Sequence, residues 1–159
     1  PVNEGYGAEV QQLGRTLLGD AFTWDRGLTQ EELADRYRAA HVLCCMSEHE
    51  GFCVPILEAF HFGLPVVGRP SGGVAEVAGD AALLTDEPHL GVVAGLLDVV
   101  LGDADLRAEL RERGRSRLRV YDERTTAAAL RAAVEEVRGR TFGPLVATLG
   151  AALDGVRVA

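Results

Sequence analysis

The feature that most constrains the fold is an alternation of short apolar runs with helical segments. The run His41–Met46 is apolar at successive positions, which favours a strand covered on both faces, as in a parallel sheet. Gly63 and Pro65 end a helix that runs from about Val54, and Pro65–Gly68 follows as the next apolar run. This alternation predicts an α/β fold built on a parallel sheet.

Further elements extend the pattern on both sides of this segment. Thr29 and Glu32 form a capping box, which predicts a helix beginning there. The other expected elements are a helix ending at Gly19, strands at 21–24 and 81–84, and helices at 73–78, 88–101, 105–120 and 125–137. We assign 1–139 to one domain and 140–159 to a C-terminal helical tail. Because a doubly wound domain usually begins with a strand, we expect this one to lack its first strand or strands.

Composition narrows the classes of function. A chain of 159 residues suits one domain, and its net charge of −8 argues against nucleic acid as a partner. All 16 basic residues are arginine, so a phosphate loop or a Schiff base that needs lysine is excluded within this chain. No apolar run approaches the roughly 18 residues of a membrane helix, so we expect no integral membrane segment. The three clustered cysteines indicate free thiols and a cytoplasmic location.

The segment 47–59 carries the strongest chemical signal, because it joins a buried strand to a helix where open α/β sheets bind ligands. We place Pro55 at the first helical position, and no Ser, Thr, Asp or Asn caps the helix. The amides near Cys53, Val54 and Ile56 are therefore candidate donors to a phosphate, which the helix dipole also favours.

Two glutamates flank the start of this helix. The side chain of Glu58 tilts toward the helix N-terminus, where its carboxylate can accept hydrogen bonds from both hydroxyls of a ribose. Glu50 precedes Gly51 in the loop. Two unit charges 4 Å apart repel by about 4 kcal/mol at an effective dielectric constant of 20. Glu50 is therefore expected to face a neutral sugar or a developing cation rather than the phosphate.

The string Glu50-Gly-Phe-Cys-Val-Pro-Ile-Leu-Glu58, with Gly63-Leu-Pro-Val-Val67, Gly72-Gly73 and Glu76-Val77, resembles the retaining family-4 glycosyltransferases. The match runs from about Thr23 to Asp122. It implies a Rossmann-like sheet flanked by helices, the C-terminal half of a GT-B fold, with extra C-terminal helices. It also implies that the chain is the donor-binding domain of an enzyme that moves a hexose from a UDP- or GDP-sugar to a hydroxyl acceptor with retention.

The same resemblance implies roles for individual residues. Glu58 would bind the nucleotide ribose, while Glu50, the catalytic candidate, and the amides of Gly51 and Phe52 would contact the donor sugar. The amides of Cys53 and Val54 would bind the diphosphate, and the turn containing Gly27 and Leu28 would lie near the base. No metal or other cofactor is implied. The basic pair that neutralises the diphosphate and the N-terminal acceptor-binding domain have no counterpart in this sequence, so the chain alone is expected to be inactive.

Other patterns have simpler interpretations. Cys45, His49 and Cys53 have a spacing that suggests zinc, but we expect these side chains to stay apart because no second ligand pair exists. Asp103-Ala104-Asp105 is interpreted as a helix cap. The arginines of 107–119 are nearly balanced by nearby acids, which favours a solvated helix face.

Three other functions are compatible with an α/β domain of this size. A receiver domain would need an acidic pocket and a lysine, and neither is present in the sequence. A nucleotide-binding regulatory module and a sugar-nucleotide epimerase of similar architecture remain the alternatives.

Overall fold

The computed structural model describes residues 4–87 and 89–139, and the chain divides into two compact units, 1–40 and 41–159. The first unit holds α1 (Glu4–Leu18), a 3-10 turn (Gly19–Ala21) and α2 (Gln30–Ala39). The capping box of α2 is confirmed: the Thr29 amide donates to Glu32 Oε2 at 2.8 Å, and the Glu32 amide donates to Thr29 Oγ1 at 3.3 Å.

The prediction of a strand at 21–24 is wrong. Ala21 belongs to the 3-10 turn, and Phe22 to Trp24 adopt no regular structure. The ring of Phe22 lies so close to Gly14 of α1 that a Cβ at Gly14 would be 2.5 Å from it. Phe22 also makes a tilted ring contact with Trp24, at 6.4 Å between centroids. The apolar side chains of this run pack on a helix and on each other, which a four-residue pattern does not distinguish from strand pairing.

The second unit is built on a three-stranded parallel sheet, as the alternation predicts. β1 (Leu43–Cys45), β2 (Val66–Gly68) and β3 (Leu83–Leu84) lie in the order β1-β2-β3, with Cys44 opposite Val67. The connections contain α3 (Val54–His61) and α4 (Val74–Ala78). Gly63, with φ of 70°, follows Phe62, the C-cap residue of α3, which confirms the expected end of this helix.

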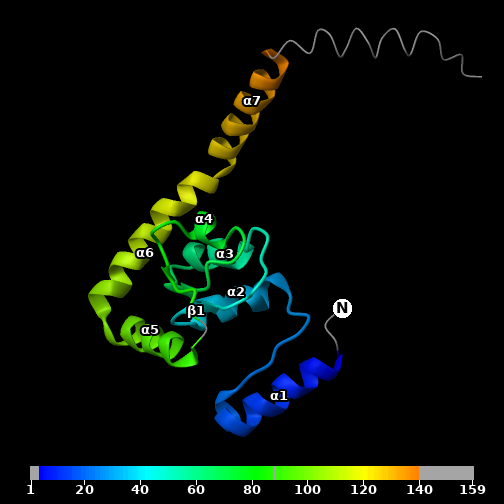
Figure 1. The fold of residues 1–159 in the computed structure, drawn as a ribbon, viewed down its shortest axis with the longest axis vertical. Helices are drawn as coiled ribbons and strands as arrows, with labels where there is room; N and C mark the ends of the chain where they lie inside the picture. Colours follow the sequence, from blue (N-terminus) through cyan, green and yellow to red (C-terminus); the bar gives the residue numbers. More distant parts are fainter. Residues whose placement is uncertain (1–3, 88, 140–159) are drawn as a thin grey trace, which may run out of the picture. The chain divides into compact units, whose positions relative to one another are not determined.

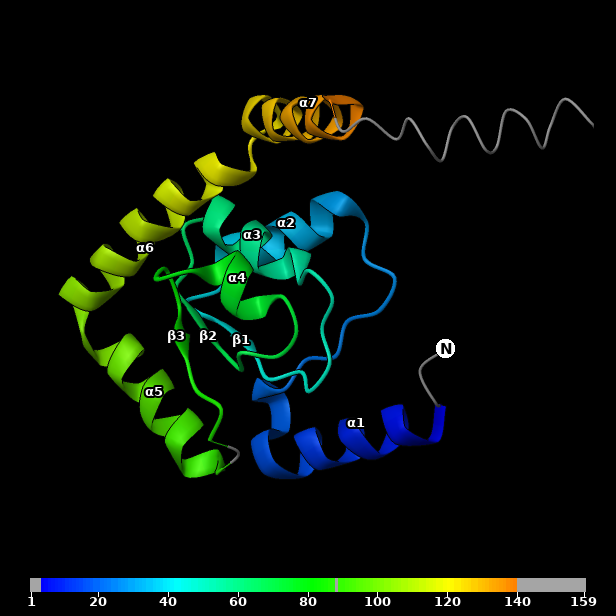
Figure 2. The same cartoon turned by 45° about the horizontal axis from the view of Figure 1, so that its top comes forward.

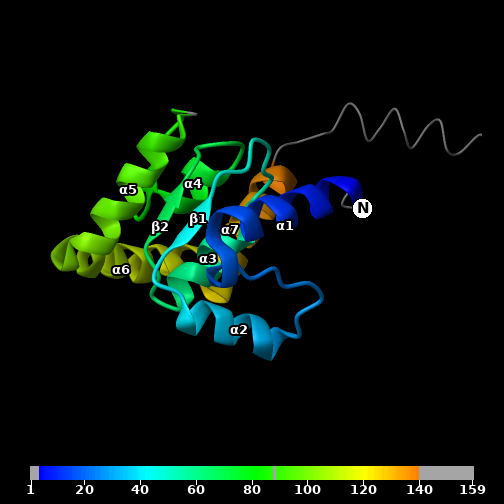
Figure 3. The ribbon, with the colours of Figure 1, turned by 90° about the horizontal axis from the view of Figure 1, so that it is seen from below.

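Three longer helices follow the sheet: α5 (Leu90–Gly102), α6 (Ala104–Leu118) and α7 (Glu123–Gly139), the last preceded by a 3-10 turn (Arg119–Tyr121). α5 and α6 lie together along one side of the strands (Figures 1 and 2), and the view from below shows β1 and β2 side by side (Figure 3). Val67 of β2, Val100 of α5 and Leu110 of α6 form the core on this side. The proposed helix at 140–159 lies outside the described residues.

α3 packs on α6 through a close approach between one aromatic residue and one glycine. Phe60 of α3 is fully buried, and a Cβ at Gly114 of α6 would lie 2.8 Å from its ring. The helix that follows the 47–53 loop is therefore packed against α6. Among the described helices, none is both long enough and apolar enough to cross a membrane.

The arginines of α6 do more than cover a solvated face, contrary to expectation. Their side chains donate to backbone carbonyls at or just beyond the C-terminal ends of other helices, where unpaired acceptors and the negative end of the helix dipole favour cations. The pairs are Arg107 with Val100 and Leu101, Arg111 with Gly63, Arg113 with Asp80, and Arg117 with Glu76 and Val77. Arg115 fits the expected pattern, because it pairs with Glu112 one turn away on the same helix, and Arg113 pairs in the same way with Glu109.

The Asp-x-Asp sequence is a helix cap, as expected. The side chain of Asp103 accepts a hydrogen bond from the Leu106 amide at 2.9 Å, and Asp105 lies in the first turn of α6.

Candidate functional site

Two loops leave the sheet side by side. The loop 46–53 follows β1 and leads into α3, and the loop 69–73 follows β2 and leads into α4. Because β1 and β2 are parallel neighbours, both loops emerge at the carboxyl edge of the sheet, where α/β proteins place their ligands.

The two loops are fastened to each other by specific contacts. Ser71 Oγ donates to the Ser47 carbonyl at 2.7 Å, and the Gly73 amide donates to the Gly51 carbonyl at 2.9 Å. A Cβ at Gly72 would lie 1.8 Å from the Glu50 carbonyl oxygen, and Gly72 also has φ of 54°, a conformation that favours glycine. The pair Gly72-Gly73 therefore sets the position of the Glu50–Gly51 backbone, a role the sequence pattern did not assign to it.

α3 begins without a side-chain cap, as expected. Its N-cap residue, Cys53, adopts φ 58° and ψ 61°, and its side chain makes no capping hydrogen bond. Val54 takes the first helical position, so Pro55 stands one position later than predicted. The Ile56 amide donates to the Cys53 carbonyl at 3.1 Å, which removes it from the expected phosphate donors. The amides of Cys53 and Val54 form no hydrogen bond within the part of the chain that is described.

The glutamates and the aromatic residue of this segment lie around the helix start. Glu50 is half-buried in the loop, and Glu58 is half-buried one turn into α3. Phe52 is 48% exposed, and its ring meets Tyr121 edge-on at 5.5 Å. Tyr121 was not identified from the sequence, because it lies 69 positions after Phe52 and no local pattern connects the two.

Two cysteines and a glutamate converge beneath the loop, so the expectation that the thiols stay apart is wrong for this pair. Cys45 Sγ lies 3.6 Å from Cys53 Sγ, and both lie within 4.8 Å of a Glu50 carboxylate oxygen. Cys53 accounts for the convergence, because its left-handed backbone immediately precedes α3 and its buried side chain reaches the end of β1. His49 is exposed and is not part of the group. All three cysteines are free, as predicted.

The environment of Cys53 keeps its thiol protonated. Burial, followed by the neighbouring Cys45 thiol and the negative charge of Glu50, raises the Cys53 pKa to about 12. A neutral, buried thiol is a poor nucleophile. The arrangement therefore does not favour a covalent role for Cys53 at neutral pH.

The remaining predicted site residues belong to the first unit. Gly27, with φ of 63°, lies in the turn before α2. Leu28 lines a surface pocket with four residues of α2, namely Glu32, Asp35, Arg36 and Ala39. The guanidinium of Arg26 lies over the ring of Trp24, 5.5 Å from its centroid.

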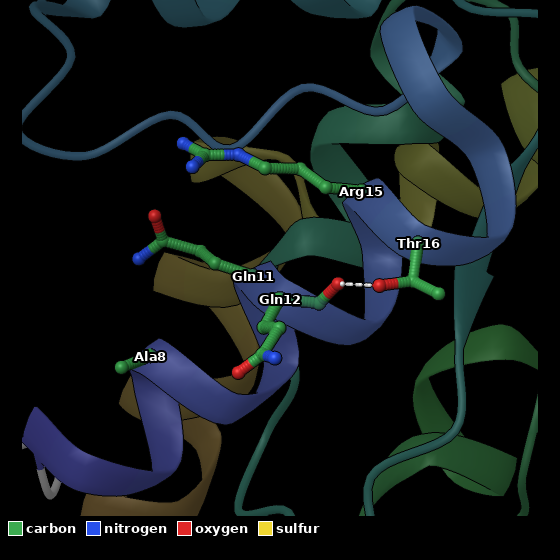
Figure 4. Close-up of a pocket in the computed structure, with 5 residues that line it drawn as sticks. All are labelled: Ala8, Gln11, Gln12, Arg15 and Thr16. Atoms are coloured by element: carbon green, nitrogen blue, oxygen red, sulfur yellow. Dashed lines mark hydrogen bonds between the residues drawn. The ribbon is translucent and has the colours of Figure 1, made fainter.

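Another surface pocket runs along α1 (Figure 4). Its lining residues are Ala8, Gln11, Gln12, Arg15 and Thr16. The Thr16 hydroxyl donates to the Gln12 carbonyl at 2.8 Å, a bond within the helix itself. Because all five residues come from one helix and none is buried, this pocket offers no converging set of functional groups.

Comparison with known proteins identifies relatives that match more than half of this chain. The family model for glycosyl transferases group 1 matches residues 7–117. An MMP alpha-(1->4)-mannosyltransferase of Mycolicibacterium hassiacum is 30% identical over 135 residues, which are 82% of this chain and 32% of that protein. A D-inositol 3-phosphate glycosyltransferase of Corynebacterium jeikeium is 34% identical over 67% of this chain and 26% of its own length. The chain thus spans about a third or less of these relatives.

The similarities extend to a further sequence and to a solved structure. The O-antigen chain mannosyltransferase B of Escherichia coli is 36% identical over 84 residues, covering 53% of this chain and 22% of that protein. The crystal structure of the C-terminal domain of a glycosyl transferase group 1 family protein from Francisella tularensis matches with a TM-score of 0.63. That match covers 76% of this chain and 64% of the other at 24% identity, and so supports the fold alone.

The family model covers more than half of the chain and includes every element from β1 to α5, together with α6 up to residue 117. The α/β architecture agrees with that of the solved C-terminal domain. The chain therefore belongs to the glycosyl transferases group 1.

Proposed function

We propose that this chain is the donor-binding part of a retaining GT-B glycosyltransferase that transfers a hexose from a UDP- or GDP-sugar to a hydroxyl acceptor. The observation that carries the proposal is the uncapped start of α3, held at the carboxyl edge of the sheet between two half-buried glutamates. A helix start of this kind favours a phosphate, and the two carboxylates offer acceptors for hydroxyl groups on either side of it.

The diphosphate is assigned to the amides of Cys53 and Val54. These amides stand at the positive end of the α3 dipole and lack partners within the described ranges. The Ile56 amide is left out of this assignment because it already bonds to the Cys53 carbonyl.

The two carboxylates are given different tasks. Glu58, one turn into α3, accepts hydrogen bonds from the ribose hydroxyls and contributes to ground-state affinity for the nucleotide. Glu50 lies on the loop beside Gly51 and faces the donor sugar together with the Gly51 and Phe52 amides. Its carboxylate stabilises the positive charge that develops as the bond from the anomeric carbon to the diphosphate breaks.

The reaction requires no group of this chain as a covalent nucleophile. The acceptor hydroxyl oxygen replaces the diphosphate on the same face of the sugar, and its proton is released. The chain contributes by holding the leaving group and by orienting the sugar. Two of the three relatives described above are named mannosyltransferases, which makes mannose the first sugar to test.

Calorimetric titration of the chain with UDP and with GDP, each in the presence of a chelator, tests the proposal. We expect one of the two nucleotides to bind without metal. At about a hundredfold excess over the dissociation constant, it should stabilise the fold by roughly 2.7 kcal/mol. The absence of both binding heat and thermal stabilisation with either nucleotide would overturn the site assignment.

A further inference from the structure

The thiols of Cys45 and Cys53 lie at a separation that suits a thiol–thiol hydrogen bond and also suits two ligands of one cation. Two zinc–sulfur bonds of about 2.3 Å at a tetrahedral angle hold their sulfurs about 3.8 Å apart. The Sγ atoms here lie 3.6 Å apart, so a single cation can bond to both with little movement.

A third ligand stands beside the pair. A carboxylate oxygen of Glu50 lies within 4.8 Å of both sulfurs, and zinc–oxygen bonds of about 2.0–2.2 Å are common in protein sites. The three side chains come from two rigid positions and one fastened loop: the end of β1, the N-cap of α3, and the loop segment held by Gly72. The backbone thus places the two short cysteine side chains, and it fixes the point from which the Glu50 side chain reaches them.

We infer that Cys45, Cys53 and Glu50 form a binding site for a thiophilic divalent cation, of which zinc is the best example. Two thiolates and one carboxylate make three protein ligands, which leaves the fourth tetrahedral position for water or another small ligand. Binding displaces the thiol protons, so each cation bound to both sulfurs releases two of them. The cation is not assigned a step in sugar transfer.

Occupation of this site has a consequence for Glu50. A carboxylate bound to the cation is no longer placed to face the donor sugar, so the cation acts as an inhibitor of transfer. This consequence rests on the proposed function, whereas the binding site itself does not.

The direct test titrates the reduced chain with Co²⁺ as the probe and records sulfur-to-cobalt charge-transfer absorption, followed by displacement with Zn²⁺. We expect one equivalent of Co²⁺ to bind with a thiolate signature and to be displaced by one equivalent of Zn²⁺. Cys45→Ser should lose at least tenfold in affinity together with most of the charge-transfer band. Glu50→Gln should keep that band but bind more weakly.

Cys44→Ser is the matched control, because Cys44 neighbours Cys45 in β1 but is exposed and outside the cluster. Wild-type behaviour in Cys44→Ser, with loss in Cys45→Ser, supports the site. No charge-transfer band in the wild-type chain, an unchanged band in Cys45→Ser, or equal loss in Cys44→Ser would overturn it. Since Cys53 is buried, the result for Cys53→Ser is used only if circular dichroism shows that this variant folds. If it does not fold, Cys45→Ser is the deciding variant.

The same samples separate this inference from the proposed function. UDP and GDP titrations are run in chelator, where no cation occupies the cluster. Nucleotide binding without a cobalt charge-transfer band would overturn the cation site alone. A cobalt charge-transfer band without nucleotide binding would overturn the proposed function alone.

Discussion

At the residue scale, the site depends on side chains that lie within a few positions of each other but do different work. Glu50, Cys53 and Glu58 occupy the loop, the N-cap and the second turn of one loop–helix unit. The first and the last of these carry a charge, and the proposal places them on opposite ends of a bound nucleotide sugar. Their separate replacement therefore tests whether the tasks are divided as proposed.

Glu58→Ala should weaken nucleotide binding more than tenfold. The substitution removes a charged hydrogen-bond acceptor, which is worth roughly 1.5–3 kcal/mol. Calorimetry with whichever of UDP and GDP binds the wild-type chain gives the measurement. Glu76→Ala is the control, since Glu76 is a glutamate near the start of another helix, in the first turn of α4, and is exposed. Equal losses in the two variants would show that Glu58 contributes only a general helix-dipole effect.

Glu50→Ala should leave nucleotide affinity nearly unchanged or raise it slightly, because a negative charge near the phosphates is removed. In the full-length enzyme, the same variant should lower kcat more than it raises KM. A contact that strengthens as the sugar becomes positive acts mainly in the transition state. Wild-type turnover in this variant would remove Glu50 from the mechanism.

Gly72→Ala should destabilise the fold by about 2–4 kcal/mol, measured by urea unfolding. The new Cβ would meet the Glu50 carbonyl oxygen at 1.8 Å, and alanine would also be strained at φ of 54°. Gly63→Ala isolates the second effect, because Gly63 has φ of 70° but nothing within 4 Å of an added Cβ. Similar destabilisation in both variants would mean that the contact between the two loops matters little.

At the scale of elements, the sequence-based predictions were correct where a feature depends on neighbouring residues and wrong where it depends on tertiary contacts. The capping box at Thr29, the stop at Gly63 and the cap at Asp103 were predictable because each depends on residues within one or two turns. The strand expected at 21–24 failed because Phe22 packs on Gly14, eight positions away. The contact between Cys45 and Cys53 depends on a left-handed backbone at a non-glycine residue, for which the sequence offers no signal.

The arginines of α6 were misjudged for a similar reason, since their partners are backbone carbonyls up to 48 positions away. A charge count cannot reveal acceptors that every residue carries. Arg117 is the clearest case: its Nε donates to the Val77 carbonyl at 3.0 Å, and it also bonds to the Tyr121 hydroxyl at 3.1 Å. α6 thus holds the end of α4, the helix that follows the glycine pair at the site.

Arg117→Met should therefore destabilise the fold by about 1.5–3 kcal/mol, the usual worth of hydrogen bonds from a charged donor. Arg115→Met serves as the matched control on the same helix, because Arg115 is exposed and pairs with Glu112, one turn away. Chemical unfolding should show a clear loss for the first variant and almost none for the second, since exposed ion pairs contribute little. Equal losses of stability in the two variants would show that the contacts of Arg117 with backbone carbonyls contribute no more than an exposed ion pair.

At the scale of the whole molecule, binding and turnover should be separable. The chain matches about a third of the Mycolicibacterium mannosyltransferase, and its proposed site addresses only the donor. No residue of that site is assigned to the acceptor hydroxyl. Ground-state affinity for the nucleotide is therefore expected of the chain alone, whereas transfer requires a second surface that orients the acceptor.

We accordingly expect the 159-residue chain to bind UDP or GDP yet to transfer no sugar from the matching donor, with GDP-mannose and UDP-glucose as the first two tested. The full-length enzyme should transfer the sugar, and the anomeric configuration of the product, read by nuclear magnetic resonance, should equal that of the donor. Retention is expected because acceptor and leaving group occupy the same face of the sugar. An inverted product would refute the retaining assignment while leaving the donor site intact. Transfer by the isolated chain would instead show that the acceptor is bound within these residues, and epimerised donor without transfer would favour the epimerase alternative.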